Sequence, residues 1–217
     1  REMNQEGVGN MFKRIYVGFH SNAGGSRGVT GLYNNETLFP GTSTSNQLVL
    51  AQLLGTEVNN DLVGIPSPPL EVPWYNRGSG ITFARSDYAF GEILGDTLGY
   101  EMDATIVEVA FHDDASDASL MRDPKARNWV ARACYQGVVR YMNRFDGVAL
   151  NFLPEPPYNV RAVATSKDIT ISWNTPIAQA GSGAASGYYA YASTNGYGFG
   201  NALYVAGGST TSVTVTN

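Results

Sequence analysis

Apolar residues gather into two short runs that predict buried strands. Residues 15–19 form the first run, which leads directly into His20 and a polar, glycine-rich segment. Residues 105–111, with the sequence TIVEVAF, form the second run and are almost continuously apolar. Runs of this kind are typical of strands that are covered on both faces. Because functional groups often lie where such strands end, the residues that follow each run are candidates for a site.

Apolar residues that recur at three- and four-residue steps predict a helix after the first run. We expect Ser45 to cap it, because a serine oxygen can accept a hydrogen bond from a free backbone N–H of the first turn. The expected buried stripe consists of Leu48, Ala51, Leu54 and Val58. Residues 63–86 follow, and their four prolines predict a long ordered loop.

A longer helix is predicted over residues 124–145. Asp123 before Pro124 is a cap and first-turn signal. Cys134 lies in the apolar stripe, so we expect it to face the core as a small hydrophobic residue and not to act as a nucleophile. The order strand, helix, loop, strand, helix is typical of an α/β fold. The stripe comprises Ala126, Trp129, Val130, Ala133, Cys134, Gly137, Val138, Tyr141, Met142 and Phe145.

The last quarter of the chain has a different composition. All 33 charged side chains lie at or before Asp168, and the residues beyond it are rich in Ser, Thr, Gly and Tyr. This composition favours short strands and turns. We therefore expect an α/β domain over residues 1–150, a proline-rich linker over 151–157 and a β domain over 158–217.

Composition also excludes several classes of function. A net charge of −5 disfavours binding to the negatively charged phosphates of nucleic acid. The single cysteine cannot form an internal disulfide. No apolar run reaches the roughly 18 residues that a membrane span needs, and the N-terminal sequence is not that of a signal peptide. We expect no nucleic-acid partner and no membrane span in this chain.

Glu108 interrupts the second apolar run. Burying an ionised carboxylate costs several kcal/mol unless donors or a cation compensate it, so this residue needs a partner. On a strand it shares a face with Ile106 and Ala110, where its pKa would rise as that of a general base does. A structural carboxylate bonded to backbone or arginine is the alternative.

His20 and His112 are the only histidines, and each directly follows a predicted strand. Imidazole is the commonest metal ligand, yet a lone histidine is also often structural. His112 is either a proton shuttle or second-shell donor, or an exposed histidine without a role. The sequence contains no Walker loop, dinucleotide fingerprint, nucleophile elbow, CxxC or HExxH motif.

Two blocks of sequence together resemble the zinc-dependent N-acetylmuramoyl-L-alanine amidases of bacterial cell walls. They are IYVGFHSNAGGSRGVTGLYN and FGEILGDTLGYEMDATIVEVAFHDDASDASLMRDPKARNWVARACYQGVVRYM. The resemblance covers residues 10–145 and implies a twisted sheet flanked by helices. It also implies that His20 is a zinc ligand with Asn22 beside it, and that Glu108 is the catalytic glutamate. Asn22 and His112 are candidates for the second shell of this site or for substrate contact.

The resemblance places only one of the three zinc ligands that this family uses. The family takes its other histidine and a glutamate from segments before the His-x-Asn strand, and here Glu2 and Glu6 are the only carboxylates upstream. We therefore expect the remaining ligands to come from a segment upstream of this chain. Asp103 departs from the family pattern, in which proline is usual, and we expect little consequence.

The C-terminal part resembles a fibronectin type III domain. PEPPYNVRAVATSKDITISWNTP resembles its first two strands, with Ile169, Ile171 and Trp173 pointing inward. SGYYAYASTNGYGFG resembles the third strand and SVTVT the fifth. The chain ends before the last two strands of such a sandwich, so we expect a partial immunoglobulin-like domain with a downstream continuation in a longer polypeptide.

These observations predict a peptidoglycan hydrolase of the cell envelope, periplasmic or extracellular, that cleaves the amide between N-acetylmuramic acid and L-alanine with zinc-activated water. The loop over residues 63–86 would shape its groove, where Trp74 and Tyr75 would either stack on sugars or pack inside the protein. A non-catalytic surface or adhesion protein with an amidase-like scaffold is the alternative. A carbohydrate-binding module, suggested by the aromatic residues alone, is a third hypothesis.

Overall fold

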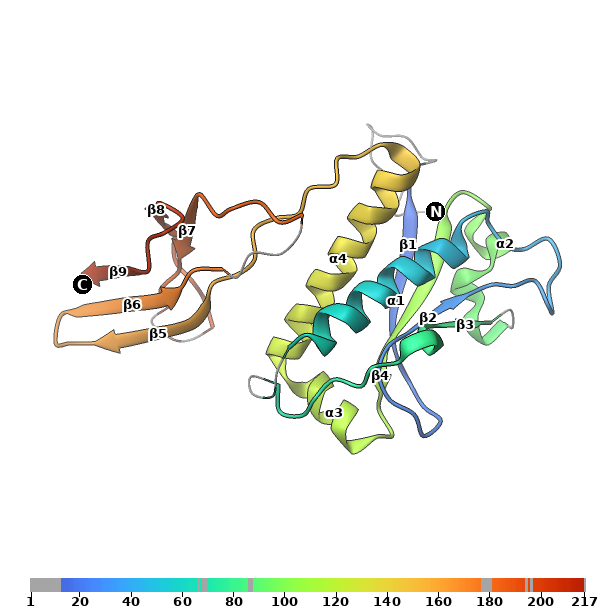
Figure 1. Ribbon diagram of the computed structural model, residues 1–217, viewed down its shortest axis with the longest axis horizontal. Helices are drawn as coiled ribbons and strands as arrows, with labels where there is room; N and C mark the ends of the chain where they lie inside the picture. The colour runs from blue at the N-terminus through green and yellow to red at the C-terminus, as the bar shows by residue number, and fades with distance from the viewer. Residues whose placement is uncertain are drawn as a thin grey trace. The chain divides into compact units, whose positions relative to one another are not determined.

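The computed structural model divides the chain into two compact units, Arg1–Ala149 and Leu150–Asn217. The elements of both are drawn in Figure 1. The structure describes residues 13–65, 67, 70–85, 88–176, 181–193, 195 and 197–216.

A four-stranded mixed sheet forms the centre of the first unit. Its strands lie in the order β1 (Ile15–Asn22), β4 (Asp103–Phe111), β2 (Thr30–Tyr33) and β3 (Thr82–Ala84). β4 runs parallel to β1 and antiparallel to β2, and β3 runs parallel to β2. Both apolar runs of the sequence therefore form strands, as predicted, and they lie side by side.

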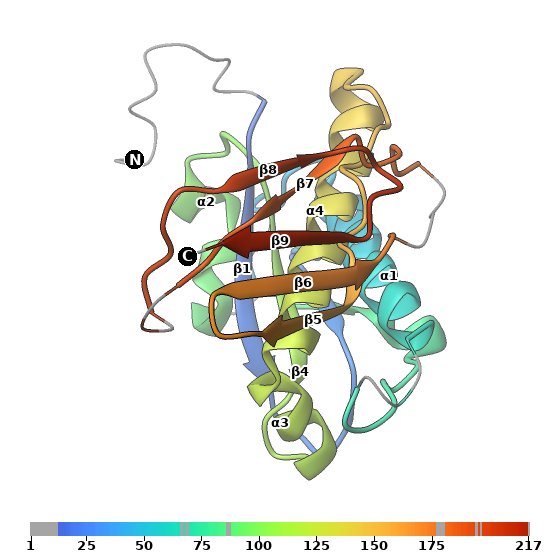
Figure 2. The same cartoon turned by 90° about the vertical axis from the view of Figure 1, so that its left-hand side faces the viewer.

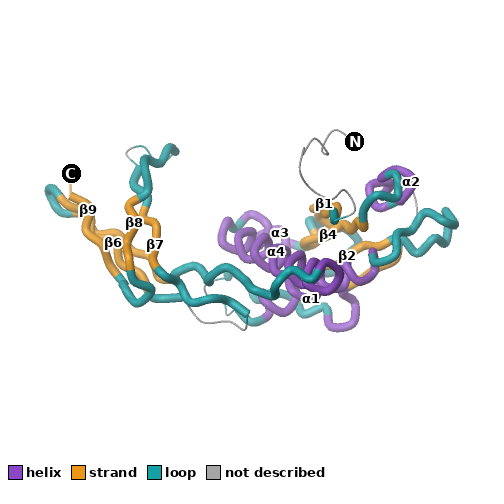
Figure 3. The backbone as a smooth tube through the Cα atoms, turned by 90° about the horizontal axis from the view of Figure 1, so that it is seen from above, coloured by secondary structure: helices purple, strands orange, loops and turns teal. Residues whose placement is uncertain are grey.

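Helices cover the sheet on two sides. Figure 3 shows α1 (Gln47–Val63) and α4 (Pro124–Asp146) on one side of β1 and β4, with α2 (Gly95–Leu98) on the other. α3 (Ala115–Arg122) connects β4 to α4, and two short 3-10 segments, η2 (Gly78–Ile81) and η3 (Tyr88–Ile93), complete the unit. The predicted α/β class with a sheet flanked by helices is confirmed for this unit.

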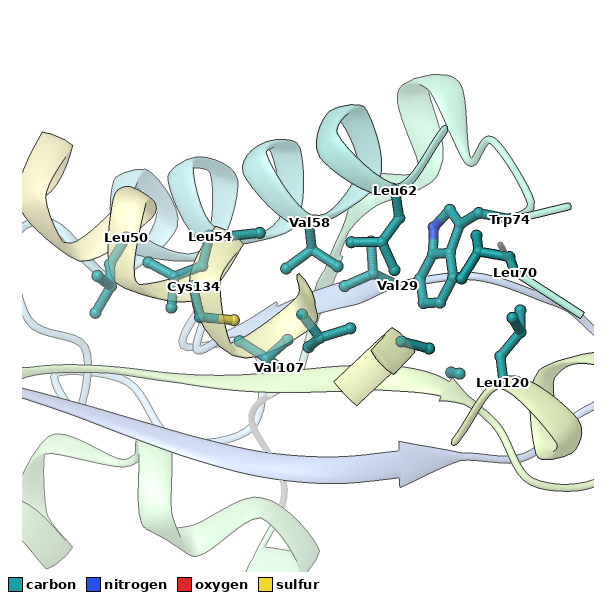
Figure 4. Close-up of a cluster of buried hydrophobic side chains, with 14 of the residues drawn as sticks. Val29, Leu50, Leu54, Val58, Leu62, Leu70, Trp74, Val107, Leu120 and Cys134 are labelled. Carbon is teal, nitrogen blue, oxygen red and sulfur yellow. The ribbon is translucent and has the colours of Figure 1, made fainter. Parts of the chain in front are cut away.

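The main core lies between the sheet and the pair α1 and α4. Figure 4 shows Leu50, Leu54, Val58 and Leu62 of α1 in a row that points toward β4. Cys134 of α4 is buried in the same cluster, and burial raises the pKa of its thiol to about 12, as expected for a residue that packs and does not react.

Close helix packing explains a glycine in this core. A Cβ on Gly137 of α4 would lie 3.0 Å from Leu54 Cα, so only glycine lets the two helices approach this closely. α4 begins as predicted, because the Asp123 side chain accepts a hydrogen bond from Lys125 N at 2.8 Å. Phe145, predicted to be buried, is 40% exposed in the last turn.

Two details of the prediction for α1 are wrong. The N-cap is Asn46 and not Ser45. Leu48 is 39% exposed, whereas Gln47 is buried and donates through Nε2 to the Ile93 carbonyl at 2.8 Å. The apolar spacing identified the helix correctly, but Gln47, four residues before Ala51, takes the place on the buried face that was expected for Leu48.

The segment predicted as a loop contains structure and core residues. It includes η2 and the edge strand β3, which pairs with β2. Trp74 is only 7% exposed and belongs to the main core, so of its two predicted roles packing is confirmed and sugar stacking is not. Tyr75 is 46% exposed, and the Arg27 guanidinium lies 5.9 Å from its ring centroid. Pro66, Pro68, Pro69 and Ser86 lie outside the described residues.

Asp103, for which we expected little consequence, is a junction between three elements. Its carboxylate accepts hydrogen bonds from the Thr44 hydroxyl (2.6 Å) and from Asn46 N (3.0 Å) just before α1. It also accepts a hydrogen bond from the hydroxyl of Tyr141 on α4. Burial and this bond together raise the pKa of the Tyr141 phenol. Proline at this position could accept none of these, so the expectation was wrong.

The second unit contains two separate small sheets, which Figure 2 shows face on. In one, β6 (Asp168–Asn174) lies between β5 (Tyr158–Ala164) and β9 (Ser212–Thr216), and both pairings are antiparallel. The other is the antiparallel pair β7 (Gly187–Ala190) and β8 (Leu203–Ala206). The all-β composition of this unit is as predicted, and its membership of the fibronectin type III class stays a prediction.

An aromatic pair joins the two small sheets. Trp173 of β6 is 6% exposed, and its ring centroid lies 5.0 Å from that of Tyr188 on β7. Ile169, predicted to point inward as well, is 42% exposed. Phe152 lies in the segment predicted as a linker, yet it is buried in this unit and its backbone bonds to Gly181 and Gly183.

Within the part of the chain that the structure describes, no helix is long and apolar enough to cross a membrane.

Candidate active site

The pairing of β1 with β4 brings the two main candidate residues together. In this parallel pair His20 lies directly opposite Glu108. The register then shifts, because Asn22 pairs with Phe111, which leaves one extra residue in β4. Bulges of this kind re-aim side chains and are frequent beside active sites. The sequence predicted His20 just after the first strand and Glu108 inside the second, and the pairing of the two strands makes them neighbours.

The bulge also corrects the predicted alternation along β4. Ile106 belongs to the small core cluster on the α2 side of the sheet, whereas Val107 belongs to the main core on the other side. Ala110 was predicted to share a face with Ile106, but it packs in the main core with Val107. The alternation holds through Val109, which also packs against the main core, and fails at Ala110, where the register with β1 shifts by one residue.

Glu108 is buried, with an exposed fraction of 5%, and no residue in the described part of the chain gives a hydrogen bond to its Oε2 atom. Burial raises the pKa of Glu108, while the positive charges of His20, Arg85 and His112 oppose this shift and the Glu92 carboxylate adds to it. Most buried polar groups in proteins have a hydrogen-bond partner, so Glu108 is a candidate for contact with a bound ligand. Its role as a general base stays a prediction.

Glu92 is a candidate that the sequence did not reveal. It lies on η3, about 70 residues from His20 along the chain, yet its Oε1 lies 2.5 Å from His20 Nε2. Its Oε2 accepts a hydrogen bond from the Tyr16 hydroxyl at 2.9 Å. A possible signal was its place directly before Ile93 and Leu94, both of which are fully buried. A carboxylate next to such residues lies close to a core.

The neighbours of Glu92 hold its backbone in place. Ile93 packs in the small cluster with Leu32, Ala104 and Ile106 on this face of the sheet. The carbonyl of Ile93 accepts the buried bond from Gln47, and Leu94 N donates to the Gly91 carbonyl at 3.1 Å. Because this segment is anchored, the Glu92 carboxylate is held against β1, where it contacts Tyr16 and His20.

The other two candidate residues lie at the rim of the site. His112 is exposed, its Nδ1 lies 3.0 Å from the Ser21 hydroxyl, and its backbone N–H donates to the Asn22 carbonyl. The Asn22 side chain accepts a hydrogen bond from Ala23 N at 2.8 Å, which forms a local turn. The second-shell or substrate roles of Asn22 and His112 stay predictions. His112 is close enough to Glu108 to lower the pKa of that carboxyl.

Two aspartates hold the glycine-rich segment that follows β1. Asp113 accepts hydrogen bonds from Gly24 N (2.8 Å) and Gly25 N (3.1 Å), which lower its pKa. Asp117 is fully buried and accepts from Arg27 Nε (2.9 Å), Gly28 N (2.7 Å) and Phe111 N (3.0 Å). These bonds fix the segment against the end of β4, so the rim beside His20 is preorganised.

The donor atoms of this face suit a zinc ion in part. His20 Nε2 and Glu92 Oε1 are close, and buried oxygens on Glu92 and Glu108 lack hydrogen-bond donors among the described residues. Over the same residues, no group of three or more His, Cys, Asp or Glu side chains is arranged to hold a metal. Glu2 and Glu6, the upstream carboxylates of the sequence, lie outside the described residues.

No family model and no curated protein matches the chain. A comparison with solved structures does find similar proteins. The apo form of the N-acetylmuramyl-L-alanine amidase Ami1 from Mycobacterium abscessus is 22% identical, with a TM-score of 0.44 over 59% of this chain and 54% of that chain. The N-acetylmuramoyl-L-alanine amidase from Clostridium difficile 630 is 18% identical, with a TM-score of 0.42 over 60% and 59%. The amidase AmiC2 of Nostoc punctiforme is 16% identical, with a TM-score of 0.42 over 60% and 58%. The chain thus spans a little over half the length of these structures.

Proposed function

We propose that this protein hydrolyses the amide bond between N-acetylmuramic acid and L-alanine in peptidoglycan, with zinc as its cofactor. The observation that carries the proposal is the register that sets His20 opposite Glu108, whose buried Oε2 has no donor among the described residues. The choice of bond rests on the resemblance of the two sequence blocks that contain these residues. The substrate places the protein in the cell envelope, outside the cytoplasm.

The roles of the residues follow from their surroundings. His20 would hold the zinc ion, which when bound polarises the substrate carbonyl and lowers the pKa of water toward 7. Glu108 takes the proton of the attacking water while the water oxygen bonds to the carbonyl carbon. When the C–N bond breaks, Glu108 passes this proton to the leaving amine of L-alanine. Burial suits Glu108 to both steps, because it raises the carboxyl pKa toward the working pH.

The test is product analysis by mass spectrometry after the full-length protein is incubated with purified muropeptides and zinc. The wild type should release N-acetylmuramic acid and a peptide with a free N-terminal alanine. Glu108→Gln should bind zinc but release at least about 100-fold less product, because the proton acceptor is lost. Glu71→Gln changes an exposed carboxylate and serves as the matched control.

His20→Ala should lose both zinc and activity, whereas His112→Ala should keep its zinc. Full activity in Glu108→Gln, or cleavage at another bond of the muropeptide, would contradict the proposal.

A non-catalytic surface or adhesion protein is the second candidate. It is favoured by the finding that the described residues contain no three-residue metal group of His, Cys, Asp or Glu. Under this hypothesis the wild type releases no product in the same assay while it still binds intact peptidoglycan in a sedimentation assay.

A further inference from the structure

Arg85 comes directly after the edge strand β3. Its backbone N–H donates to the Tyr33 carbonyl at 2.8 Å, just beyond the last residue pair of β2 and β3. Its guanidinium carbon lies 5.2 Å from the ring centroid of Phe83 and 5.1 Å from that of Phe90. Guanidinium groups within about 6 Å of a ring centroid are attracted to the ring. The backbone bond and the two rings together restrict where the guanidinium lies.

The Phe90 ring places this guanidinium on the η3 side of the sheet. Phe90 packs against the small buried cluster that contains Ile93 and Ile106. Ile106 lies two residues before Glu108 on β4, so the side chains of these two residues share a face. Burial raises the pKa of Glu108, and the charge of Arg85 is among those that oppose the rise. Arg85 is therefore a neighbour of the candidate base.

The strands that carry His20 and Arg85 lie on opposite sides of β4. In the strand order β1, β4, β2, β3, the strand of His20 is next to β4 on one side, and the strand before Arg85 is two places away on the other (Figure 1). Both side chains are close enough to lower the pKa of Glu108 against the larger effect of its burial. Across the sheet, the site therefore contains the expected zinc ligand, the base and a guanidinium.

The proposed reaction determines which part of the substrate can bring a negative charge to this site. The lactyl carboxyl of N-acetylmuramic acid is part of the amide that is cleaved, so the free carboxylates of the substrate lie in its peptide. Glu108 gives its proton to the amine of that peptide, so the peptide leaves past the base. Glu92 and Glu108 would repel an anionic peptide there. A guanidinium instead binds a carboxylate through two parallel hydrogen bonds.

We propose that Arg85 binds a carboxylate of the peptide that begins with L-alanine, and that it selects anionic peptides over their amidated forms. This inference rests on the proposed hydrolysis and names the part of the substrate that the site recognises. The rings of Phe83 and Phe90 hold the guanidinium, so its N–H donors need little ordering when the carboxylate binds. Arg85 determines specificity here and takes no part in proton transfer.

The rival role for Arg85 is to compensate the charges of Glu92 and Glu108 without contact with the substrate. In that role Arg85→Gln would change the affinity for every muropeptide by about the same factor. Direct contact makes the effect of Arg85→Gln depend on the substrate carboxylate. A double-mutant cycle separates the two roles, with one change in the protein and the other in the substrate.

Isothermal titration calorimetry of the full-length protein with two muropeptides tests the contact. The muropeptides differ only at the residue after L-alanine, which carries either a free carboxylate or a carboxamide. Glu108→Gln is the background, so that neither muropeptide is consumed, and a chelator keeps the result independent of metal. This protein should bind the carboxylate form at least about 10-fold more tightly, the effect of one charged hydrogen-bonded pair. Equal affinities, or no measurable binding of either muropeptide, would overturn the proposal.

Substitutions of Arg85 in this background complete the cycle. Arg85→Gln should bind the two muropeptides equally within about twofold, and Arg85→Lys, which keeps the charge but not the fork, should keep a preference of only about 2–4-fold. Arg144→Gln is the matched control. Arg144 is also exposed and lies 5.4 Å from the ring centroid of Phe145, but it belongs to α4 on the other side of the sheet. A full preference in Arg85→Gln, or its loss in Arg144→Gln, would contradict the proposal.

A further variant leaves the guanidinium in the chain and removes one of its two rings. Phe83 is 55% exposed, so Phe83→Leu should leave the fold intact, and thermal unfolding checks this for each variant. Without this ring the preference for the carboxylate should fall by about 2–5-fold, the size of an exposed contact between a cation and a ring. An unchanged preference in Phe83→Leu would contradict the role of the ring in holding Arg85.

Product analysis with the wild-type protein and the same two muropeptides keeps this inference separate from the proposed function. The preference should appear in KM with little change in kcat, because Arg85 holds the peptide and not the amide that reacts. If the wild type cleaves both muropeptides with the same KM, the inference about Arg85 alone fails. If the carboxylate form binds more tightly but neither muropeptide is cleaved, the proposed function alone fails.

Discussion

The two faces of the sheet in the first unit differ in what they bury. The face toward α1 and α4 is covered by a large apolar cluster that includes Leu54, Val107 and Cys134. The face toward η3 has a small cluster around Ile93 and Ile106, and beyond it the cover changes to the polar groups Glu92, His20 and Glu108. One face therefore supplies stability, and the other places charges where burial changes their chemistry.

This difference shows how one small sheet can both stabilise the fold and position charged groups. Packing on the α1 side fixes the strands, and the strands fix the register that sets His20 against Glu108. The cost of burying carboxylates on the η3 side is offset by the apolar core behind it. Changes on the first face should therefore alter stability, and changes on the second should alter chemistry.

The largest expected effect is that of Glu108→Gln, which should lower activity at least about 100-fold and yet stabilise the metal-free protein. Burial raises the pKa of Glu108, so the folded state holds this proton more strongly than the unfolded chain does. Stability therefore falls as pH rises from the ordinary glutamate pKa to the raised one. Glutamine avoids this loss.

Thermal unfolding in the presence of a chelator measures this effect. The variant should melt above the wild type at pH 7, and the difference should vanish as pH falls well below 4, where the wild-type carboxyl is protonated in both states. A variant that melts below the wild type at pH 7 would show that the ionised carboxylate is stabilised by groups not recognised above.

Leu54→Ala tests the opposite face. Leu54 is fully buried between α1 and α4, so its truncation should cost about 2–5 kcal/mol of unfolding free energy, measured by urea denaturation. Zinc affinity should remain unchanged below the unfolding transition. A large loss of zinc affinity in the folded variant would mean that the two faces are not separate. The exposed Leu48 provides a control on the same helix, and Leu48→Ala should cost far less.

Asp117→Asn should destabilise the rim of the site by about 3 kcal/mol. Its buried carboxylate accepts three hydrogen bonds, one of them from Arg27, and the amide would leave that guanidinium with only the partly exposed Asp114 as a charge partner. Urea denaturation gives the loss, and the exposed Asp96→Asn should show almost none. Equal stability of the two variants would contradict the role of Asp117 in fixing the segment after β1.

Substitution of Cys134 should have the smallest effect on activity. With a pKa of about 12 it carries almost no thiolate at pH 8, so the native protein should react with a thiol reagent at least about 100-fold more slowly than the protein in urea. Cys134→Ala should leave product release unchanged. Fast labelling of native Cys134 would show that the core on the α1 side opens readily.

Local signals predicted a good part of this structure. The apolar runs predicted β1 and β4, and Asp123 predicted the start of α4. The polar segment after the first run pointed to His20, and the charge inside the second run pointed to Glu108. In each case the signal lies within a few neighbouring residues, because it depends on side-chain periodicity or on capping.

The misses depend on contacts between distant segments. Glu92 reaches His20 from a 3-10 segment that has no periodic pattern, and Asp103 joins the start of β4 to residues before α1 and on α4. Ala110 changes face because of a bulge that only strand pairing reveals. Trp74 enters the core although the prolines around it are typical of an exposed loop. No local pattern encodes these contacts.

The most direct test of the account is a crystal structure of the zinc-loaded full-length protein with anomalous diffraction data at the zinc edge. The zinc-loaded protein should give one strong anomalous peak on the η3 side of the sheet, within bonding distance of a ring nitrogen of His20 and with Glu108 close by but not bonded. A peak elsewhere, or no peak within bonding distance of His20, would contradict the proposed function.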